Sequence, residues 1–259
     1  MPMDYSRLFP EIGEEVWYFP SLSRAMLLSA EFVNRFPRKA NGRIIWAGKL
    51  TQAKGRFERK WFAEKGGLWL SLSLYDEFLP ETRPLIPLAI GLALLKSVHQ
   101  LGATQVKLKW INDLPVNGRK LAGVLTQKWK DWLIVGMGLN VKNPTPSHLP
   151  AISIRELLKK EVPLCKILSS LIHWLRYYLG FLRFYERKLL YEEDVKNIII
   201  EDFKCFSDTI GRCVYYHYNT EHEDGIYGEV LDIGPKGELI LKTEEDVQSF
   251  DSGEVIYLL

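Results

Sequence analysis

The stretch KWINDLPVNGRKLAGVL, from Lys109 to Leu125, combines strand-like apolar runs with charged and amide side chains. The Asn-Gly pair at its centre is a strong signal of a tight β-hairpin, and the run that follows is typical of a buried strand. A strand that only fills a core has no use for Lys109, Asp113 and Lys120 so close together, because buried charges need partners. The pattern therefore predicts a strand edge beside a polar pocket.

The bulk composition is that of an ordinary globular protein. Of the 259 residues, 47% are hydrophobic and 25% are charged, and the net charge of +2 is too balanced to indicate nucleic-acid binding. The three cysteines form no C-x-x-C pair, which favours a reducing compartment over disulfides or a zinc site. The N-terminus lacks the basic head and apolar run of a secretory signal. We therefore expect a cytoplasmic protein that binds neither nucleic acid nor membranes.

Hydrophobic periodicity divides the chain into helices and strands. Apolar residues spaced by three and four predict helices over residues 23–36, 84–102, 152–161, 164–190 and 192–206. Alternation and short apolar runs predict strands over residues 15–19, 43–48, 66–76, 105–110, 121–128 and 132–137. Residues 49–65 have almost no apolar periodicity and are predicted to form a basic loop.

The character of the sequence changes near Ser207. From there the chain consists of short apolar segments separated by Gly, Asp and Asn, including one predicted strand that begins at Asp224. This is the pattern of a small antiparallel barrel or sandwich. We therefore predict an α+β chain with two domains, residues 1–206 and residues 207–259.

Three segments carry polar residues that suit a nucleotide site. They are the opening stretch, the basic loop TQAKGRFERKW (51–61) and VGMGLNV (135–141). Each segment taken alone has a structural explanation, respectively a solvated turn, a solvated surface loop and glycines that permit close strand packing.

Taken together, the three segments indicate more than a surface. Gly55 and Arg56 offer close backbone approach beside a guanidinium that grips a phosphate or a carboxylate. Asn112, Asp113 and Asn140 offer the oxygen ligands that Mg²⁺ prefers. Cations beside such a site suit a nucleoside triphosphate. No G-x-x-x-x-G-K-[ST] motif occurs, which excludes a P-loop NTPase.

The order of these motifs resembles that of the biotin–protein ligases of the biotin/lipoate protein ligase superfamily. The shared pattern over residues 42–141 is a basic loop ending in R-K-W, then G-G-L-W-L-S-L, K-W-x-N-D-L, G-R-K-L-A-G-V-L and G-x-G-L-N-V. The closing strands, with S-G-E-V, are similar to the small C-terminal domain of that family. The resemblance implies a class II synthetase-like mixed β-sheet flanked by helices, followed by an SH3-like β-barrel.

The resemblance implies a two-step reaction with ATP and Mg²⁺ as cofactors and biotin as the substrate. Biotin's carboxylate attacks the α-phosphorus of ATP to give biotinyl-5'-AMP, and a lysine on the biotin carboxyl carrier domain of a carboxylase then displaces AMP. Dense positive charge is expected because one anion must attack another. The pattern begins close to Met1, so we expect a single-function ligase without an N-terminal DNA-binding domain. A homodimer is a further expectation by analogy.

The resemblance also implies roles for individual residues. Lys120 and Arg56 are expected to be catalytic, because they fall on positions that contact the carboxyl and phosphate groups of the adenylate. The residues expected to bind biotin and the adenylate are Lys54, Gly55, Arg56, Trp61, Gly66, Gly67, Leu68, Lys120 and Gly123. The residues expected to bind ATP are Lys109, Asn112, Asp113 and Asn140, of which Asp113 and Asn140 would contact Mg²⁺.

The chain departs from the family pattern where the ureido ring of biotin is recognised. Leu50 takes the place of a glutamine, and Ala53 and Glu58 take the place of glycines. The early Ser-Thr-Asn motif is replaced by S-R-A-M, which leaves Ser21 or Ser23 as the candidate hydroxyl. Each lost hydrogen bond to a buried polar group costs about 1–3 kcal/mol. The sequence therefore favours adenylate chemistry more strongly than it favours biotin itself.

Two alternative functions follow from these departures. A lipoate- or octanoate-type ligase or acyltransferase of the same superfamily would explain Leu50 and the lost hydroxyls, whereas K-W-x-N-D-L and the closing strands favour biotin. A degenerate, non-catalytic ligase that only binds a cofactor or a partner would have no need of Arg56, Lys120 and Asn140.

Overall fold

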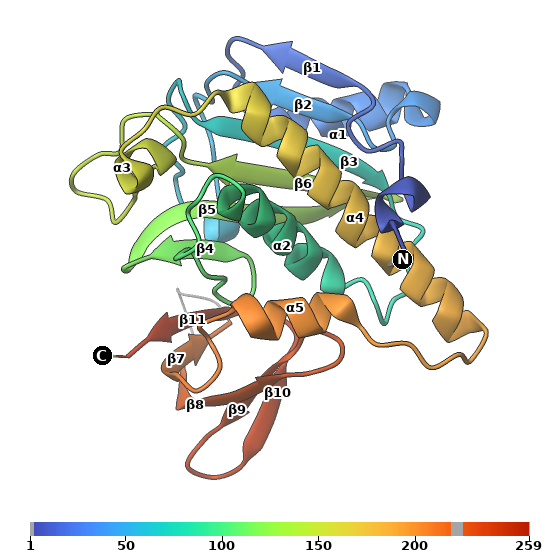
Figure 1. Cartoon of the computed structure of the whole chain (residues 1–259), viewed down its shortest axis with the longest axis vertical. Helices are drawn as coiled ribbons and strands as arrows, with labels where there is room; N and C mark the ends of the chain where they lie inside the picture. Colours follow the sequence, from blue (N-terminus) through green and yellow to red (C-terminus); the bar gives the residue numbers. More distant parts are fainter. Residues whose placement is uncertain (1–2, 219–224, 259) are drawn as a thin grey trace.

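The computed structural model describes residues 3–218 and 225–258, which form two β-sheets (Figure 1). In the larger sheet, of order β1-β2-β3-β6-β5-β4, β1 and β2 pair in parallel and the other neighbours pair antiparallel. Its strands are β1 (Val16–Phe19), β2 (Ile44–Ala47), β3 (Leu68–Tyr75), β4 (Asp113–Val116), β5 (Arg119–Trp129) and β6 (Trp132–Leu139).

The second sheet is antiparallel, with the order β10-β9-β8-β7-β11. Its strands are β7 (Cys213–His217), β8 (Ile226–Ile233), β9 (Leu239–Lys242), β10 (Val247–Phe250) and β11 (Glu254–Tyr257). The strand predicted to begin at Asp224 starts outside the described residues and is found from Ile226 onward. A mixed sheet followed by an antiparallel sheet confirms the predicted α+β class.

Helices cover both faces of the larger sheet. The long helices α2 (Leu85–His99) and α4 (Leu164–Leu190) lie on one face, and α1 (Ala25–Arg35) lies on the other (Figure 1). The shorter elements are α3 (Ile154–Leu158), α5 (Ile198–Phe206) and the 3-10 turns η1 (Tyr5–Leu8), η2 (Pro37–Lys39) and η3 (Arg56–Glu58). Within the described ranges, no helix combines the length and the apolar character that crossing a membrane requires.

Strand β3 shows how the sequence sets this arrangement. Its leucines point into the core that they share with α2 and α4. The alternate positions face α1, where the hydroxyl of Ser29 donates a 2.8 Å hydrogen bond to that of Ser71. Because both faces of β3 are covered, all of its residues except Tyr75 are buried. The small serines on the α1 side let that helix approach the sheet closely.

The strand predicted over residues 105–110 is wrong. The apolar residues of this stretch are buried, but its backbone forms only isolated bridges. The N–H of Leu108 donates to the carbonyl of Phe206 and its carbonyl accepts from the N–H of Asp208, while Lys109 exchanges two backbone hydrogen bonds with Asp113 at the start of β4. The alternation therefore reflects burial against the linker at 206–208. The strand that pairs with β5 is instead β4, whose Pro115 is tolerated because β4 is an edge strand with a register shift at that residue.

Two predicted helices are shorter than their periodicity suggested. Helix α5 begins six residues later than the predicted start at 192, because the side chain of Asn197 accepts from the N–H groups of Ile199 and Ile200 and caps the helix there. Helix α3 begins after the cap Ser153 and ends at Lys159, which adopts a left-handed conformation with φ of 52°.

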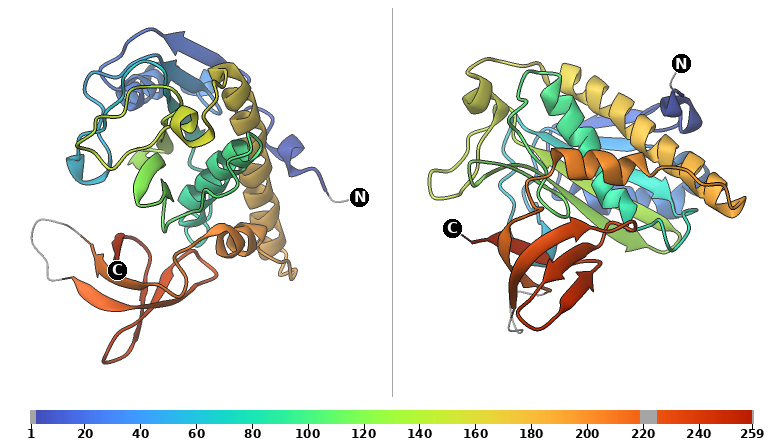
Figure 2. Two further views of the ribbon diagram at one scale, coloured as in Figure 1. Left: turned by 60° about the vertical axis from the view of Figure 1, so that its left-hand side comes forward. Right: turned by 60° about the horizontal axis from the view of Figure 1, so that its bottom comes forward.

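The second sheet packs beneath the end of α5 and against the residues that precede β4 (Figure 2). The indole Nε1 of Trp110 donates a 2.9 Å hydrogen bond to the carbonyl of Gly237 in the β8–β9 turn. Lys204 of α5 forms a 2.6 Å ion pair with Asp232 of β8. These contacts fix the second sheet against the residues of the opening stretch. The division into domains at residue 207 stays a prediction.

Gly180 in α4 provides a test of how tightly the N-terminal turn is docked. A Cβ atom there would overlap the backbone oxygen of Tyr5 in η1. Gly180→Ala should therefore lower the free energy of unfolding by about 1–3 kcal/mol through overpacking, although glycine-to-alanine changes inside helices usually stabilise. Chemical denaturation measures this difference.

The matched control is Gly91→Ala in α2, where the added Cβ would meet the end of the Leu108 side chain at 3.3 Å. That side chain can move, so the control should change the unfolding free energy by less than about 1 kcal/mol. Equal effects of the two substitutions would contradict the docking of η1 on α4.

Candidate active site

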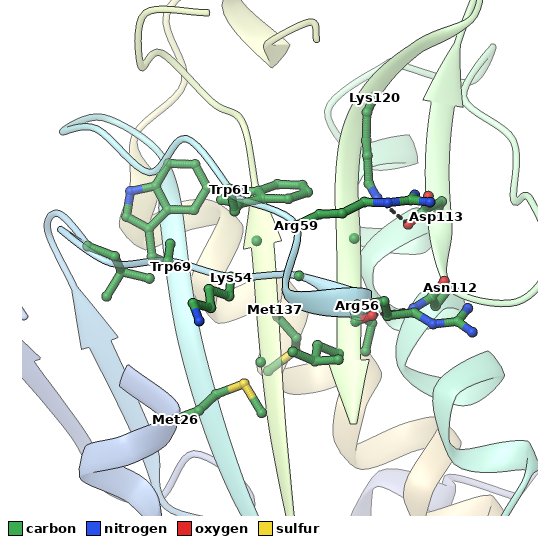
Figure 3. A pocket seen from close by; sticks show the side chains of 18 of the residues that line it. Met26, Lys54, Arg56, Arg59, Trp61, Trp69, Asn112, Asp113, Lys120 and Met137 are labelled. Atoms are coloured by element: carbon green, nitrogen blue, oxygen red, sulfur yellow. Dashed lines mark hydrogen bonds and ion pairs between the residues drawn. The ribbon is translucent and has the colours of Figure 1, made fainter. Parts of the chain in front are cut away.

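A cavity of about 580 Å³ lies on the α1 side of the larger sheet, between β3, β5, β6 and the basic loop. One side of it is mostly apolar and includes Met26, Ala30, Leu50, Ala53, Trp69, Leu125, Ile134 and Met137. The other side is charged and is lined by Arg56, Arg59, Lys109, Asn112, Asp113, Lys120 and Glu254. Figure 3 shows this division, with Met26 and Trp69 on one side and Asn112, Asp113 and Lys120 on the other.

The floor of the cavity is bare backbone at two glycines of the central strands. A Cβ atom at Gly138 would lie 3.1 Å from the ring of Trp61, and one at Gly123 would lie 3.0 Å from Cε of Lys120. Both contacts are tighter than ordinary van der Waals distances. Glycine at these positions therefore lets Trp61 and Lys120 lie close above the sheet.

The β4–β5 hairpin creates the central ion pair of the charged side. Its turn is the predicted Asn-Gly pair, and both Asn117 and Gly118 adopt the positive φ values, 49° and 72°, that tight hairpins favour. The hairpin brings Nζ of Lys120 to 2.7 Å from Oδ1 of Asp113 (Figure 3). The same ammonium lies 5.2 Å from the centre of the Trp61 ring.

Two further cations are held in partly desolvated positions. Burial lowers the pKa of Lys109, although Asp113 and Glu254 oppose this shift. Burial likewise lowers the pKa of Arg56, again against the attraction of Glu254 and Asp113. A guanidinium and an ammonium that have lost water interact more strongly with an incoming anion than solvated ones do. The charged side is therefore suited to phosphate or carboxylate oxygens.

The basic loop folds back on itself over the cavity. The N–H of Gly55 donates a 2.8 Å hydrogen bond to the carbonyl of Arg59, and Phe57 and Glu58 between them have positive φ values of 53° and 55°. Nη1 of Arg59 lies 2.8 Å from Oε1 of Glu254. The second sheet therefore anchors the loop. The sequence contained no local signal for this contact, because the two residues are 195 positions apart.

Comparisons with known proteins agree with this geometry. Residues 32–140 match the profile of the Biotin/lipoate A/B protein ligase family. The bifunctional ligase/repressor BirA of Bacillus subtilis is 25% identical over 94% of this chain and 74% of its own length. The biotin–[acetyl-CoA-carboxylase] ligase of Mycobacterium tuberculosis is 28% identical over 84% of this chain and 80% of its own. Over residues 32–140 the sequence is therefore similar to the biotin/lipoate A/B protein ligase family.

Solved structures place the chain in the same fold. The biotin protein ligase from Aquifex aeolicus in complex with biotin and ATP superposes with a TM-score of 0.78, at 23% identity, over 95% of this chain and 99% of that one. The biotin protein ligase from Leishmania major in complex with biotinyl-5-AMP gives a TM-score of 0.64, at 19% identity, over 95% and 99%. The likeness in fold extends over both sheets of the chain.

The cavity brings together most of the residues that the family pattern singled out. Those that line it are Lys54, Gly55, Arg56, Trp61, Lys109, Asn112, Asp113, Lys120 and Gly123. The sequence did not single out Met26, Trp69, Arg59 or Glu254, which also line it. Met26 and Trp69 lie within two stretches of the family pattern, S-R-A-M and G-G-L-W-L-S-L, but neither was named as a contact, because each has the apolar character of an ordinary core residue.

Four predicted site residues lie outside the lining of the cavity. Leu68 is buried in the main core, and Gly66 turns the chain with a φ of 103° against the backbone of Asn143. Gly67 gives room to the indole of Trp69, which a Cβ atom would overlap. Asn140 is buried, and its side chain donates a 3.2 Å hydrogen bond to the carbonyl of Lys120. These residues support others that line the cavity, and their direct contact with a ligand stays a prediction.

The donor set fits a Mg²⁺ ion that arrives with a nucleotide. The described residues contain no group of three or more His, Cys, Asp or Glu side chains that could hold a metal by themselves. Mg²⁺ bound to a triphosphate needs only one or two protein carboxylates, because phosphates and water supply the remaining ligands. Asp113 offers one carboxylate on the charged side, with 26% of its side chain exposed. Asn140 is bonded within the protein and is a poorer candidate.

The anchor of the basic loop predicts a pH dependence of stability. Burial pushes the pKa of Glu254 upward, but the hydrogen bond and charge of Arg59 outweigh it, so the pKa is lowered on folding. The ion pair therefore stabilises the fold above the ordinary pKa of a glutamate, and this contribution is lost as the pH falls through the lowered value. Glu254→Gln should reduce the unfolding free energy by about 0.5–1 kcal/mol at neutral pH.

Urea denaturation of both proteins at pH 7 and at about pH 3 measures this dependence. The difference between wild type and Glu254→Gln should shrink toward zero at the lower pH. A difference that is the same at both pH values would show that the carboxylate does not act through its charge.

Proposed function

We propose that this protein activates biotin with ATP as biotinyl-5'-AMP and transfers it to a lysine of a biotin carboxyl carrier domain. The observation that carries the proposal is the division of one cavity into an apolar side and a side with four cations around Asp113 and Glu254. Such a cavity suits an acid with an apolar body whose carboxylate must meet a triphosphate. The similarity over 84% of the chain to a protein named as a biotin–[acetyl-CoA-carboxylase] ligase supports the same substrates.

In the first step, a carboxylate oxygen of biotin bonds to the α-phosphorus of ATP, and the bond from that phosphorus to the bridging oxygen of pyrophosphate breaks. Lys120, Arg56 and Lys109 lie where they can neutralise the negative oxygens of both reactants and of the leaving group. Mg²⁺, held at Asp113, would share the charge of the triphosphate.

In the second step, a lysine amine of the carrier attacks the acyl carbon, and the bond from that carbon to the phosphate oxygen breaks. AMP leaves and the nitrogen loses a proton to give an amide. The mixed anhydride must survive until the carrier arrives, which requires that water is kept out. Trp61 and the basic loop cover the cavity and supply that protection. A carboxylase carrier domain as partner and a cytoplasmic setting belong to this proposal.

The direct test is ATP–pyrophosphate exchange that depends on added biotin, followed by transfer to a purified carrier domain. Exchange with biotin and covalent labelling of the carrier are expected. No exchange with biotin or with any other carboxylic acid, at any Mg²⁺ concentration, would indicate a protein that only binds.

A second candidate function is favoured by one observation. Leu50, Ala53 and Met26 line the side of the cavity that should hold the ureido ring, and they offer it no hydrogen bonds. An apolar acid such as lipoate or octanoate would also fit there. Calorimetric titration with biotin and with lipoate separates the two, because micromolar or tighter binding of lipoate alone would favour the lipoate-type ligase.

Lys120→Ala should slow biotin-dependent exchange by about 100-fold or more, which is the usual effect of removing one donor that stabilises a transition state. The fold should remain intact, since Asp113 keeps access to water. The control is Lys188→Ala, which removes another paired lysine outside the cavity and should leave exchange unchanged. Normal exchange in Lys120→Ala would remove this residue from the mechanism.

Arg56→Ala should instead weaken retention of the adenylate, because the guanidinium of the covering loop is lost. Release of biotinyl-5'-AMP should accelerate by about tenfold or more, the effect of losing a hydrogen bond to a charged group. Trapping of the released adenylate by hydroxylamine measures the rate, with Arg35→Ala on the exposed face of α1 as the control. Unchanged trapping would contradict a role for Arg56 in holding the intermediate.

A further inference from the structure

Three charged side chains gather on the apolar side of the cavity. Arg24, which immediately precedes α1, places its Nη2 atom 3.5 Å from Oε2 of Glu58 in the basic loop. The same carboxylate oxygen pairs with Lys54. Nε of Arg24 donates a 3.0 Å hydrogen bond to the carbonyl of Gln52. All three charged residues line the cavity, and we call them the Arg24 cluster.

The Arg24 cluster is made of residues that depart from the family pattern. Arg24 stands within S-R-A-M, where the family has Ser-Thr-Asn, and Glu58 stands where it has a glycine. The two departures lie far apart in sequence but contact each other in the fold. Glu58 also keeps a φ of 55°, a left-handed conformation that glycine would adopt without strain. In this conformation the carboxylate contacts both cations.

The surroundings of the cluster otherwise offer little to a polar ligand. Met26, Leu50 and Trp69 line the cavity beside it. Figure 3 shows Lys54 extending toward the side of Met26 and Trp69, away from Asn112 and Asp113. An acid whose carboxylate lies at Lys120 therefore has its far end near the Arg24 cluster.

The guanidinium of Arg24 is held so that it can donate to a ligand. The carbonyl of Gln52 accepts from Nε and Glu58 accepts from one terminal nitrogen. The other terminal N–H groups donate no hydrogen bond to residues 3–218 or 225–258. Glu58 pairs with both cations and balances one of their two positive charges. The ligand group that suits this arrangement is a neutral acceptor, a carbonyl oxygen. A purely apolar chain would displace water from these N–H groups without offering them a hydrogen-bond acceptor.

We propose that Arg24 determines the specificity of the site for an acid whose far end carries a urea or amide carbonyl oxygen, with Glu58 as its positioning residue. This inference rests on the function proposed above and names how the biotin ring is recognised without the usual hydroxyls. Arg24 donates to the carbonyl oxygen, and Glu58 and the carbonyl of Gln52 orient the guanidinium.

The test compares biotin with two other acids in ATP–pyrophosphate exchange. Octanoate has no far-end acceptor, and 2-iminobiotin replaces the urea oxygen with an NH group. Arg24→Ala should lower kcat/KM for biotin by about 10- to 100-fold, the effect of losing a charged hydrogen-bond donor. The value for octanoate should change by less than about threefold, because octanoate has no acceptor for that donor. The preference of wild type for biotin over 2-iminobiotin should shrink to a similar extent.

Two further variants separate recognition from folding. Glu58→Gly introduces a residue that fits the left-handed backbone, so the loop should keep its conformation. The guanidinium of Arg24 should lose its orientation. KM for biotin should therefore rise by about 3- to 10-fold with kcat nearly unchanged. Arg155→Ala, which breaks a surface ion pair with Glu161 outside the cavity, is the matched control and should leave both acids unaffected.

Equal losses with biotin and octanoate in Arg24→Ala, or no loss with biotin, would overturn the proposal while leaving the ligase function in place. If wild type shows no exchange with any acid, the proposed ligase function is wrong. The role of Arg24 can then still be tested by calorimetric titration, which measures the affinity for biotin. Biotin should then bind wild type more tightly than Arg24→Ala by the same factor. Equal affinities of wild type and Arg24→Ala for biotin would overturn the proposal in this case as well.

Discussion

The ion pair between Lys120 and Asp113 is the constraint on which the site depends. It spans the β4–β5 hairpin, and the hairpin can close only because Asn117 and Gly118 accept positive φ values. Removal of either partner would leave the other charge unpaired at the charged side of the cavity, where it keeps access to water. Lys109, Arg56 and Glu254 are arranged around this pair, so the charged side of the cavity is organised from the hairpin outward.

The sequence predicted much of this arrangement because its signals were local. The Asn-Gly turn, the leucine alternation of β3 and the long apolar stripe of α4 each depend on neighbours in the chain. The strand predicted over 105–110 failed because alternation reports burial and does not report which backbone accepts the hydrogen bonds. Strand β4 was not predicted because Pro115 argues against a strand, although an edge strand tolerates a proline.

The parts of the site that could not be predicted come from distant segments. Arg59 meets Glu254 across the two sheets, and Arg24 meets Glu58 across the cavity. The local sequence around each of these residues does not indicate its partner. The same limit explains why S-R-A-M and Glu58 looked like two separate losses from the family pattern. Only in three dimensions do they become one feature.

The contribution of β11 has a consequence for the order in which the protein matures. Glu254 lies on the last described strand, yet it closes the wall of the cavity and tethers the loop above it. A nascent chain that has already folded its larger sheet still lacks that wall until β11 emerges and pairs with β7. The loop above the cavity is therefore tethered only after the second sheet has formed.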